Sequence, residues 1–573
     1  MFSPRRAYRG AKERSTFLTV GGRIIVMKIL FNAALKKYHE NKFVESESLC
    51  RKILNKDTNH FPSLNLIGIL LIEKGKLEDA RRSLAKAIKI NPKYIFSHYN
   101  MGNVLKLLGN SQGAIDSYNN VINLNPKFLN AQLNLGNIFQ KLGQLKLAVN
   151  CYLKVLKIDP NFTAAHINLG IIFRELGDQK KAINHCKKAI LINPKLAIAY
   201  NALGIMFIEL GAKQKAINHF RKAVKYDQKN LYYLYQLTNL KENILDLHLK
   251  KNIHKLIESK SLSKENLAYA NLLLSKYEFN NGNHKKEFNY LIHGHNFFFE
   301  SQRKIFENSL KYLNKLLIKI EDLNFKDLDK KLKINNNLKP IFIIGVPRSG
   351  STLIEKIIVS GSRKIPIGEE IGIIQNIFQK EIMSNKVSLD YYIENIKNIL
   401  VKQYNERGLI KKSANFIFTD KSLENFFYIG LIKIIFPHAK IINCRRDPLS
   451  SIVSIIKNNL NKIAWAHNIE HIFKYFDMYF KYIKYWDDLF PDFIYDLQYE
   501  KFVNNLEIES KKLFEYCNLP WNKKCLEFYK RNDLISKTTS NLQIRNPINQ
   551  DSLKKYEPYK KLLLQYADKY QWI

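Results

Sequence analysis

The sequence is poor in several features that define familiar classes of protein. Its six cysteines form no Cys-x-x-Cys pair and no group with metal-ligand spacing, so we expect no metal site and a reducing, cytoplasmic compartment. No apolar run reaches the roughly 18 to 20 residues that cross a bilayer, which excludes a membrane span. Acidic residues are also few, and 51 of them against 92 lysines and arginines leave a formal net charge of +41.

The excess of positive charge is spread over the whole chain. A charge of this size usually indicates nucleic acid or an anionic surface as the partner. The basic residues are mostly lysines, however, and no arginine-rich arm or nucleic-acid-binding module accompanies them. We therefore do not expect nucleic-acid binding, although the charge can attract an anionic substrate.

The chain is too long for one core, since 573 residues exceed the size of an ordinary domain. Residues 1–26 carry five arginines and a single acid, Glu13, and superficially resemble a transit peptide. Because Met27 begins the first repeat unit, we instead expect residues 1–26 to be a disordered extension.

Residues 27–230 repeat with a period of 34 residues. Each unit is predicted to be a pair of helices with two recurring glycines, one where the two helices cross and one at the end of the first helix. A proline follows the second helix, which it cannot continue. The spacing is typical of about six tetratricopeptide repeats, the first of them degenerate. Residues 231–335 are helical in pattern but lack the repeat, so we expect a helical cap or linker there. The recurring residues are Gly68, Gly102, Gly136, Gly170 and Gly204; Gly75, Gly109, Gly143, Gly177 and Gly211; and Pro92, Pro126, Pro160 and Pro194.

One polar position recurs within the repeats, at Asn100, Asn134 and Asn168. In tetratricopeptide arrays that resemble the one in O-linked N-acetylglucosamine transferase, such asparagines line the concave face and bind an extended peptide. A side-chain amide both donates and accepts hydrogen bonds, so it can hold a peptide backbone whatever its sequence. The alternative is that these asparagines are exposed polar positions on solvated helices.

Residues 336–573 change to short apolar strands that alternate with amphipathic helices. Strands are predicted at Ile341–Val346, Phe416–Thr419, Ile441–Cys444 and Phe493–Leu497. This alternation predicts an α/β domain with a central parallel sheet, following an all-α superhelix of repeats. Ligands of such sheets bind beyond the carboxyl ends of the strands.

The first predicted strand leads into the sequence GVPRSGST, which then enters a helix. Backbone N–H groups of such a turn and the positive end of the helix form a phosphate-binding site. Gly345, Gly350 and Thr352 are in register with the phosphate-binding loop of nucleotide hydrolases, but Ser351 stands where their lysine would be. That lysine reaches the terminal phosphates, so its absence disfavours nucleoside triphosphate chemistry.

The same loop, with Arg348 in it, looks like the 5′-phosphosulfate loop of sulfotransferases. Residues 338 to about 565 resemble the sulfotransferase family that includes tyrosylprotein sulfotransferases, and the whole chain resembles bacterial proteins that join this domain to tetratricopeptide repeats. The resemblance implies 3′-phosphoadenosine 5′-phosphosulfate (PAPS) as the co-substrate and no metal. It implies nucleotide contacts by Arg348, Ser349, Gly350, Ser351, Thr352, Arg446, Ser454, Tyr499 and Lys555.

The resemblance also implies catalytic roles. Glu370 matches the general base, with Glu369 as the alternative, and Lys421 and Ser540 match residues that stabilise charge on the transferred group. A hydroxyl is a weak acid, so a positioned carboxylate helps remove its proton during attack. Two family arginines are replaced here, by Gly372 and Asn458.

Bland alternatives exist for two of these matches. The alternative for Arg446 is a surface salt bridge with Asp447 or another acid. The alternative for Glu369 and Glu370 is that acids are common where a helix begins.

The expected function is transfer of a sulfuryl group from PAPS to a hydroxyl acceptor, with the repeats recruiting an acceptor or partner protein. A protein tyrosine, a sugar, a lipid or a small alcohol are all open as acceptors. One alternative is a kinase-like nucleotide enzyme, and another is a repeat scaffold with a vestigial sulfotransferase domain. The oligomeric state is left open.

Overall fold

The computed structural model describes residues 23–240, 244–321, 323, 325–327, 337–361, 365–379, 389–410, 416–460, 463–531, 545–548 and 556–572. The chain divides into two compact units, Met1–Ala202 and Leu203–Ile573, and each is described by itself. The first helix begins at Arg23, within the extension that the sequence analysis expects to be disordered. The sequence-based boundaries at residues 230 and 335 stay predictions.

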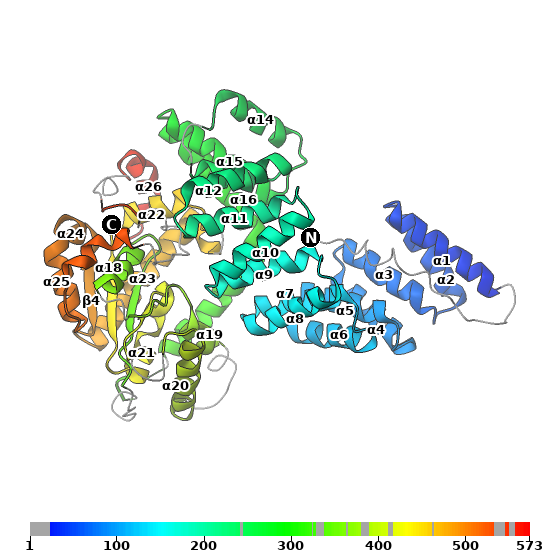
Figure 1. The fold of residues 1–573 in the computed structure, drawn as a ribbon, viewed down its shortest axis with the longest axis horizontal. Coiled ribbons are helices and arrows are strands. Elements are labelled where there is room, and N and C mark those ends of the chain that lie inside the picture. The colour runs from blue at the N-terminus through cyan, green and yellow to red at the C-terminus, as the bar shows by residue number, and fades with distance from the viewer. Residues whose placement is uncertain are drawn as a thin grey trace. The chain divides into compact units, whose positions relative to one another are not determined.

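Twelve helices in the described residues 23–226 form six consecutive hairpins, which Figure 1 shows from blue to cyan-green. Each pairs a first helix with the next one along the chain. Their bounds are α1 (Arg23–His39), α2 (Phe43–Lys56), α3 (Phe61–Glu73), α4 (Leu77–Ile90), α5 (Ile95–Leu107), α6 (Ser111–Leu124), α7 (Leu129–Lys141), α8 (Leu145–Ile158), α9 (Thr163–Glu175), α10 (Gln179–Ile192), α11 (Ala197–Glu209) and α12 (Lys213–Tyr226).

Both glycine rows of the repeats have a steric cause. A Cβ at Gly102 would lie 2.6 Å from the Tyr118 ring, and one at Gly136 would lie 2.5 Å from the Tyr152 ring. The two helices of a hairpin therefore cross too closely for any side chain at this position. Gly143 has a φ of 73° and ends its helix in the left-handed conformation that Gly adopts at little cost. The 34-residue period thus records one crossing and one helix end per repeat.

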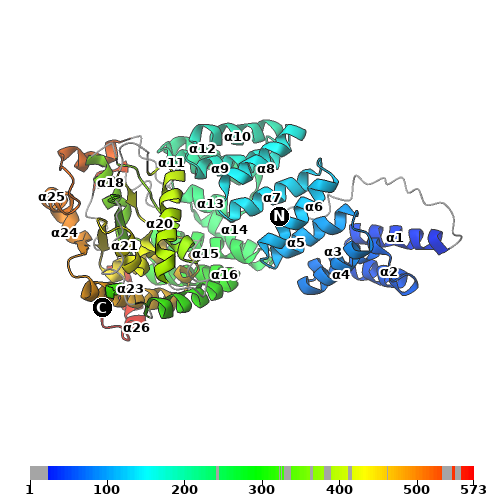
Figure 2. The ribbon, with the colours of Figure 1, turned by 90° about the horizontal axis from the view of Figure 1, so that it is seen from below.

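The helices that follow the repeats belong to the second compact unit. They are α13 (Leu231–Thr238), α14 (Leu247–Glu258), α15 (Lys264–Asn280) and α16 (His284–Glu321). The side chains of Asn230, Asp246 and Ser263 accept hydrogen bonds from N–H groups at the starts of α13, α14 and α15, which fixes where these helices begin. Figure 2 shows α16 running beside helices of the α/β domain.

A parallel sheet of four strands lies in the α/β domain, in the order β2-β1-β3-β4. The strands are β1 (Ile341–Gly345), β2 (Thr419–Asp420), β3 (Lys440–Arg445) and β4 (Ile494–Gln498). The predicted parallel sheet is confirmed, and the strand bounds differ from the predicted ones by one residue at most except in β2. Strand β2 is assigned to Thr419–Asp420 instead of Phe416–Thr419, although the Phe416 and Phe418 carbonyls already accept hydrogen bonds from residues 339 and 341.

Helices cover both faces of this sheet. Their bounds are α18 (Ser351–Gly361), α19 (Ile373–Ile377), α20 (Leu389–Glu406), η3 (Leu423–Tyr428), α21 (Ile429–Ile435), α22 (Pro448–Lys457), η4 (Ala464–His467), α23 (Ile469–Leu489), α24 (Tyr499–Asn504), α25 (Leu506–Tyr516), η5 (Lys523–Lys530), η7 (Glu557–Tyr559) and α26 (Lys560–Ala567). In the described residues no helix is long and apolar enough to cross a membrane.

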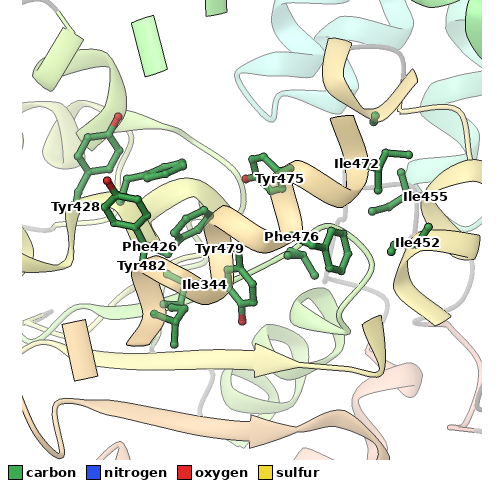
Figure 3. Close-up of a cluster of buried hydrophobic side chains, with 14 of the residues drawn as sticks. Ile344, Phe426, Tyr428, Ile452, Ile455, Ile472, Tyr475, Phe476, Tyr479 and Tyr482 are labelled. Carbon is green, nitrogen blue, oxygen red and sulfur yellow. The ribbon is translucent and has the colours of Figure 1, made fainter. Parts of the chain in front are cut away.

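Alternate residues of β1 point to two different cores. Phe342 and Ile344 belong to a cluster that includes aromatic side chains of α23 and η3, part of which Figure 3 shows. Ile341 and Ile343 belong to a second cluster with Ile354 of α18. Because both faces of the strand are buried, the run IFII has no polar alternation, as is usual for parallel sheets.

The first of these clusters extends from the α/β domain into the helices before it. Leu272 of α15 and Phe298 of α16 are buried in the same cluster as Phe342 and Tyr475. His295 of α16 is fully enclosed and lies 2.8 Å from His467 of η4, Nδ1 to Nδ1, while its Nε2 lies 2.6 Å from the Ile456 carbonyl oxygen. The helical segment and the α/β domain therefore share one core.

Candidate active site

The turn between β1 and α18 lies close to the end of β3 and to the first residue of α24. A Cβ at Gly345 would lie 2.7 Å from the Cys444 carbonyl oxygen at the end of β3, and one at Gly350 would lie 2.4 Å from the Tyr499 ring. Gly350 and Arg348 have φ values of 95° and 72°. The glycines let the backbone approach its neighbours, and α18 then begins with its N-terminus at the turn, where anions are favoured.

Two arginines that follow different strands, β1 and β3, meet at this turn. Nε of Arg348 donates to Oγ of Ser454 over 2.9 Å, and Nη1 of Arg446 donates to the Arg348 carbonyl oxygen over 3.3 Å. The Arg446 guanidinium also lies 5.0 Å from the centre of the Tyr499 ring. Burial and the neighbouring Arg446 together lower the pKa of Arg348 to about 10. Two cations held so close favour an anion between them.

Buried hydroxyl groups accompany the arginines. Oγ of Ser349, Ser450 and Ser451 has no hydrogen-bond partner within the described part of the chain, although all three residues are buried. A buried polar group without a partner is costly, so such groups commonly await a ligand or water. Asp447 caps α22 by accepting from the Ser450 backbone N–H over 2.7 Å. The donor set and its positive charge fit a ligand that carries phosphate groups.

A second polar group lies at the end of β2 and in the loop after α18. Nζ of Lys421 lies 2.8 Å from Oε1 of Glu370, whose side chain is 53% exposed while that of Lys421 is fully buried. Burial alone would lower the pKa of Lys421, but Glu370, Glu355 and Glu369 raise it above its ordinary value. Lys421 is therefore a buried cation, and Glu370 is a carboxylate open to an incoming molecule.

The loop that carries the two glutamates is fixed to β2 by backbone contacts. A Cβ at Gly368 would lie 2.0 Å from the Thr419 carbonyl oxygen, so only Gly fits there. The Lys421 N–H donates to the Glu369 carbonyl oxygen over 2.8 Å, and Glu369 has a φ of 51°. Gly372, which replaces a family arginine, has a φ of 57° and donates its N–H to Oγ of Ser422 over 2.8 Å.

Two further members of this group, Glu355 and Lys356 of α18, are not among the residues predicted from the sequence. Oε1 of Glu355 accepts from the Thr419 hydroxyl over 2.8 Å and from the Glu369 N–H over 3.1 Å. Burial raises the pKa of Glu355, partly opposed by Lys421 and Lys356. Nζ of Lys356 lies 3.5 Å from Oε1 of Glu369. Adjacent charges inside the apolar helix STLIEKIIVSG were the signal available.

Two matched residues, Ser540 and Lys555, lie outside the described residues. Asn458, which replaces the second family arginine, closes α22 by donating from Nδ2 to the Ser454 carbonyl oxygen over 2.7 Å. The remaining matched residues follow the carboxyl ends of β1 to β4, as expected for a parallel sheet, except Glu370, which reaches Lys421 from the loop after α18. Their roles in binding and catalysis stay predictions.

The repeated asparagines form a ladder of hydrogen bonds inside the array. Nδ2 of Asn134 lies 3.3 Å from Oδ1 of Asn103, and Nδ2 of Asn168 lies 2.8 Å from Oδ1 of Asn137, each acceptor belonging to the preceding repeat. Asn100 is buried and donates to Oδ1 of Asn65 over 3.0 Å. These amides join neighbouring repeats, whereas peptide binding by the row stays a prediction.

Comparison with curated proteins finds two relatives that match part of the chain. The chain is 32% identical over 238 residues to an uncharacterized protein of Aquifex aeolicus, a match that covers 39% of this chain and 31% of that protein. It is 26% identical over 254 residues to protein-tyrosine sulfotransferase 1 of Danio rerio, covering 39% of this chain and 66% of that protein. The chain therefore spans only part of the length of either relative.

Comparison with solved structures finds matches to part of the chain. MamA of Desulfovibrio magneticus RS-1 is 25% identical, with 29% of this chain and 93% of that chain covered and a TM-score of 0.27. YrrB, described as a TPR protein with an unusual peptide-binding site, is 20% identical, with 32% and 96% covered and a TM-score of 0.28.

Family profiles match two parts of the chain. The tetratricopeptide-repeat profiles match residues 68–109, 102–143, 136–177, 163–196 and 197–230. The profile of the sulfotransferase family matches residues 340–523, which contain the turn, both glutamates, Lys421 and Arg446. The chain thus combines tetratricopeptide repeats with a domain of the sulfotransferase family.

Proposed function

We propose that this protein is a sulfotransferase that uses PAPS as the donor and a hydroxyl group as the acceptor. The observation that carries the proposal is the convergence of Arg348, Arg446 and Ser454 at the turn after β1. The pair Glu370 and Lys421 lies at the end of β2, the strand beside β1. A dianionic phosphate and a phosphosulfate both require several oriented donors, and this site offers guanidinium, hydroxyl and backbone N–H groups together.

In the proposed reaction, the acceptor oxygen forms a bond to sulfur as the bond from sulfur to the bridging oxygen of the 5′-phosphate breaks. Glu370 accepts the acceptor's proton, and 3′-phosphoadenosine 5′-phosphate (PAP) leaves with the electron pair of the broken bond. Lys421 and the turn at Arg348 stabilise the charge that develops on the leaving side. Fixed cations in a buried site cost no reorganisation during the reaction, so their effect is large.

Glu355 has a positioning role in this scheme. Its Oε1 joins Thr419 on β2 to the Glu369 backbone on the acceptor side, and the Lys421 N–H donates to the Glu369 carbonyl oxygen. The loop with the base and the strand with the cation are thereby held in one register. Such preorganisation matters because small displacements of catalytic groups cost large factors in rate.

The acceptor class follows only from likeness. The Danio rerio relative is a protein-tyrosine sulfotransferase, and tetratricopeptide repeats commonly bind proteins, so a tyrosine in a recruited protein is our favoured acceptor. Gly372 stands where family members carry an arginine on the acceptor side. Sugars, lipids and small alcohols are therefore the other acceptors to test, and cytoplasmic location stays a prediction.

Calorimetric titration with PAP and, separately, with ATP and Mg²⁺ tests the donor assignment. We expect PAP to bind and ATP to bind more weakly, because Ser351 replaces the lysine that reaches terminal phosphates. Tighter binding of ATP would favour the kinase-like alternative. Binding of neither nucleotide would favour a scaffold with a vestigial domain. Incubating cell extract with radiolabelled PAPS and the purified protein would then identify the acceptor.

A further inference from the structure

The last repeat hairpin is part of the compact unit that contains the sulfotransferase domain. The division between the two units falls inside α11, so the end of α11 and all of α12 belong with residues 231–573. Within this hairpin, Gly204 lies against Phe220 as in the other repeats. The hairpin therefore has the sequence of a repeat, but from Leu203 on it packs as part of the second compact unit.

One side chain from the sulfotransferase domain reaches the turn of this hairpin. Nη2 of Arg545 donates to the carbonyl oxygen of Glu209 over 2.9 Å, and Glu209 is the last residue of α11. A cation at the carboxyl end of a helix is favoured by the helix dipole. A Cβ at Gly211 would lie 2.7 to 2.9 Å from the Arg545 side chain. The Arg545 side chain thus packs against Gly211, where any other residue would place its Cβ in steric conflict with Arg545.

Three residues after Arg545, the chain reaches the hydrophobic core of the α/β domain. We call the turn between β1 and α18 the donor turn. Ile548 is partly buried and packs on the cluster that contains Ile343 of β1 and Ile354 of α18. Three peptide units span at most about 11 Å. Residues 545–548, the bridge segment, therefore connect the turn of the last repeat with the hydrophobic cluster to which β1 and α18 contribute.

We propose that the bridge segment links donor binding to the last repeat, with Arg545 as its positioning residue. Ligand at the donor turn restrains α18 and, through Ile548 and Arg545, the end of α11. By linkage, a partner whose affinity for the last repeat is raised by bound PAP raises the affinity for PAP by the same factor. The inference rests on the proposed function, because PAP is the probe of the donor site. It gives the repeats a role in catalysis that is separate from holding an acceptor.

The repeats themselves supply a matched control. Gly177 and Gly211 occupy the same position in successive repeats, with φ values of 84° and 75°, so Ala imposes the same backbone strain at either. A Cβ at Gly177 would meet no atom within 4 Å among the described residues, whereas one at Gly211 would meet Arg545. Comparing Gly211→Ala with Gly177→Ala therefore isolates the contact with Arg545.

The experiment measures PAP affinity of the full chain by calorimetry for Arg545→Ala, Gly211→Ala, their combination, and Gly177→Ala. We expect each of the first two variants to weaken PAP binding about fivefold or more, and their combination to be no weaker than Arg545→Ala alone. Gly177→Ala should bind like the wild type. Additive losses, or equal losses in both glycine variants, would overturn the proposal.

Hydrogen–deuterium exchange separates linkage from a merely structural contact. Saturating PAP should slow exchange of amides in residues 205–220 of the wild type and leave them unchanged in Arg545→Ala, with Arg545→Lys intermediate. If PAP binds the wild type and neither affinity nor exchange depends on Arg545, the inference fails alone. If the wild type binds no PAP, the proposed function fails first.

Discussion

Arg348 and Ser454 are joined by a hydrogen bond of 2.9 Å from Nε to Oγ, although 106 residues separate them in the chain. Each follows a different strand, and the strands β1 and β3 are neighbours in the sheet. The contact places the turn after β1 and the second half of α22 in one site, where Arg446 also reaches the Arg348 backbone.

Replacing Arg446 with Ala should weaken PAP binding about 10- to 100-fold, because a buried charge-assisted hydrogen bond is lost. The neighbouring Arg445 is the control, since its side chain is 45% exposed and pairs with Asp496 at 2.7 Å. Arg445→Ala should bind PAP nearly as the wild type does. Calorimetry measures both, and equal losses would show that only total charge matters at this edge of the sheet.

Replacing Glu370 with Gln should lower transfer by about 10² to 10⁴ while PAP affinity stays nearly unchanged, because the base contacts the acceptor and not the nucleotide. Glu369→Gln is the matched variant, as Glu369 pairs with the other buried lysine, Lys356. Steady-state transfer and PAP titration of both variants test the assignment. If Glu369→Gln is the inactive one, the base is one position earlier.

Replacing Lys421 with Ala should lower turnover by about 10²- to 10³-fold. The pKa of Lys421 is raised by its carboxylate neighbours, so the ammonium stays charged at neutral pH and its contribution to stability disappears only as pH rises beyond 10.5. Lys356→Ala, which removes a buried cation from the same network, controls for misfolding. Undiminished turnover in Lys421→Ala would remove this lysine from the mechanism.

The buried pair His295 and His467 should make stability depend on pH. Burial lowers the pKa of His295 to about 4, and burial with the neighbouring His295 lowers that of His467 to about 3. Below pH 6.5 the unfolded chain therefore binds protons that the folded chain does not, and stability is lost as pH falls. The slope should be about 1.4 kcal/mol per pH unit for each imidazole.

Chemical unfolding of wild type and His467→Asn between pH 6.5 and 4.5 measures this slope. Asn can still donate to Nδ1 of His295 but does not titrate, so about half of the His-dependent slope should vanish. Carboxylates that titrate in the same range are common to both proteins and cancel in the difference. Parallel pH profiles would show that the pair binds protons in the folded state.

Replacing Asn100, Asn134 and Asn168 together with Ala should weaken sulfation of a protein acceptor and leave transfer to a small phenol unchanged, if this row binds peptide. Each change also breaks a hydrogen bond between repeats, which costs about 1 kcal/mol. Thermal unfolding must therefore be measured beside transfer. Unchanged sulfation of a genuine protein acceptor would make the row purely structural.

Patterns local in sequence predicted most of the fold. The glycines at Gly136 and Gly143 recur because one crossing and one turn recur, so the 34-residue period is visible without any long-range information. The strands around Ile341 and Ile441 are likewise local, as buried parallel strands are continuously apolar. The shift of β2 to Thr419–Asp420 arises because pairing depends on where the neighbouring strand lies.

Contacts between distant segments could not be predicted. In the sequence, Glu355 is an acid within an apolar helix, and only the fold shows that its Oε1 accepts from Thr419 of β2. In the same way, His295 is close to His293 in the sequence but contacts His467 in the structure. Arg545 gives no signal that its partner is the turn at Gly211. Such contacts depend on packing between elements far apart in the chain.

The core shared by α15, α16 and the sulfotransferase domain bears on how the protein can be dissected. A fragment that starts at residue 336 would lack Leu272 and Phe298, which belong to the core cluster of the α/β domain, and would expose His467 of η4, whose ring lies 5.0 Å from that of Phe298. Large exposed apolar patches promote aggregation. A fragment meant to retain activity should therefore start before α11, inside which the second compact unit begins. During evolution, repeats should have been exchanged only among those that precede α11.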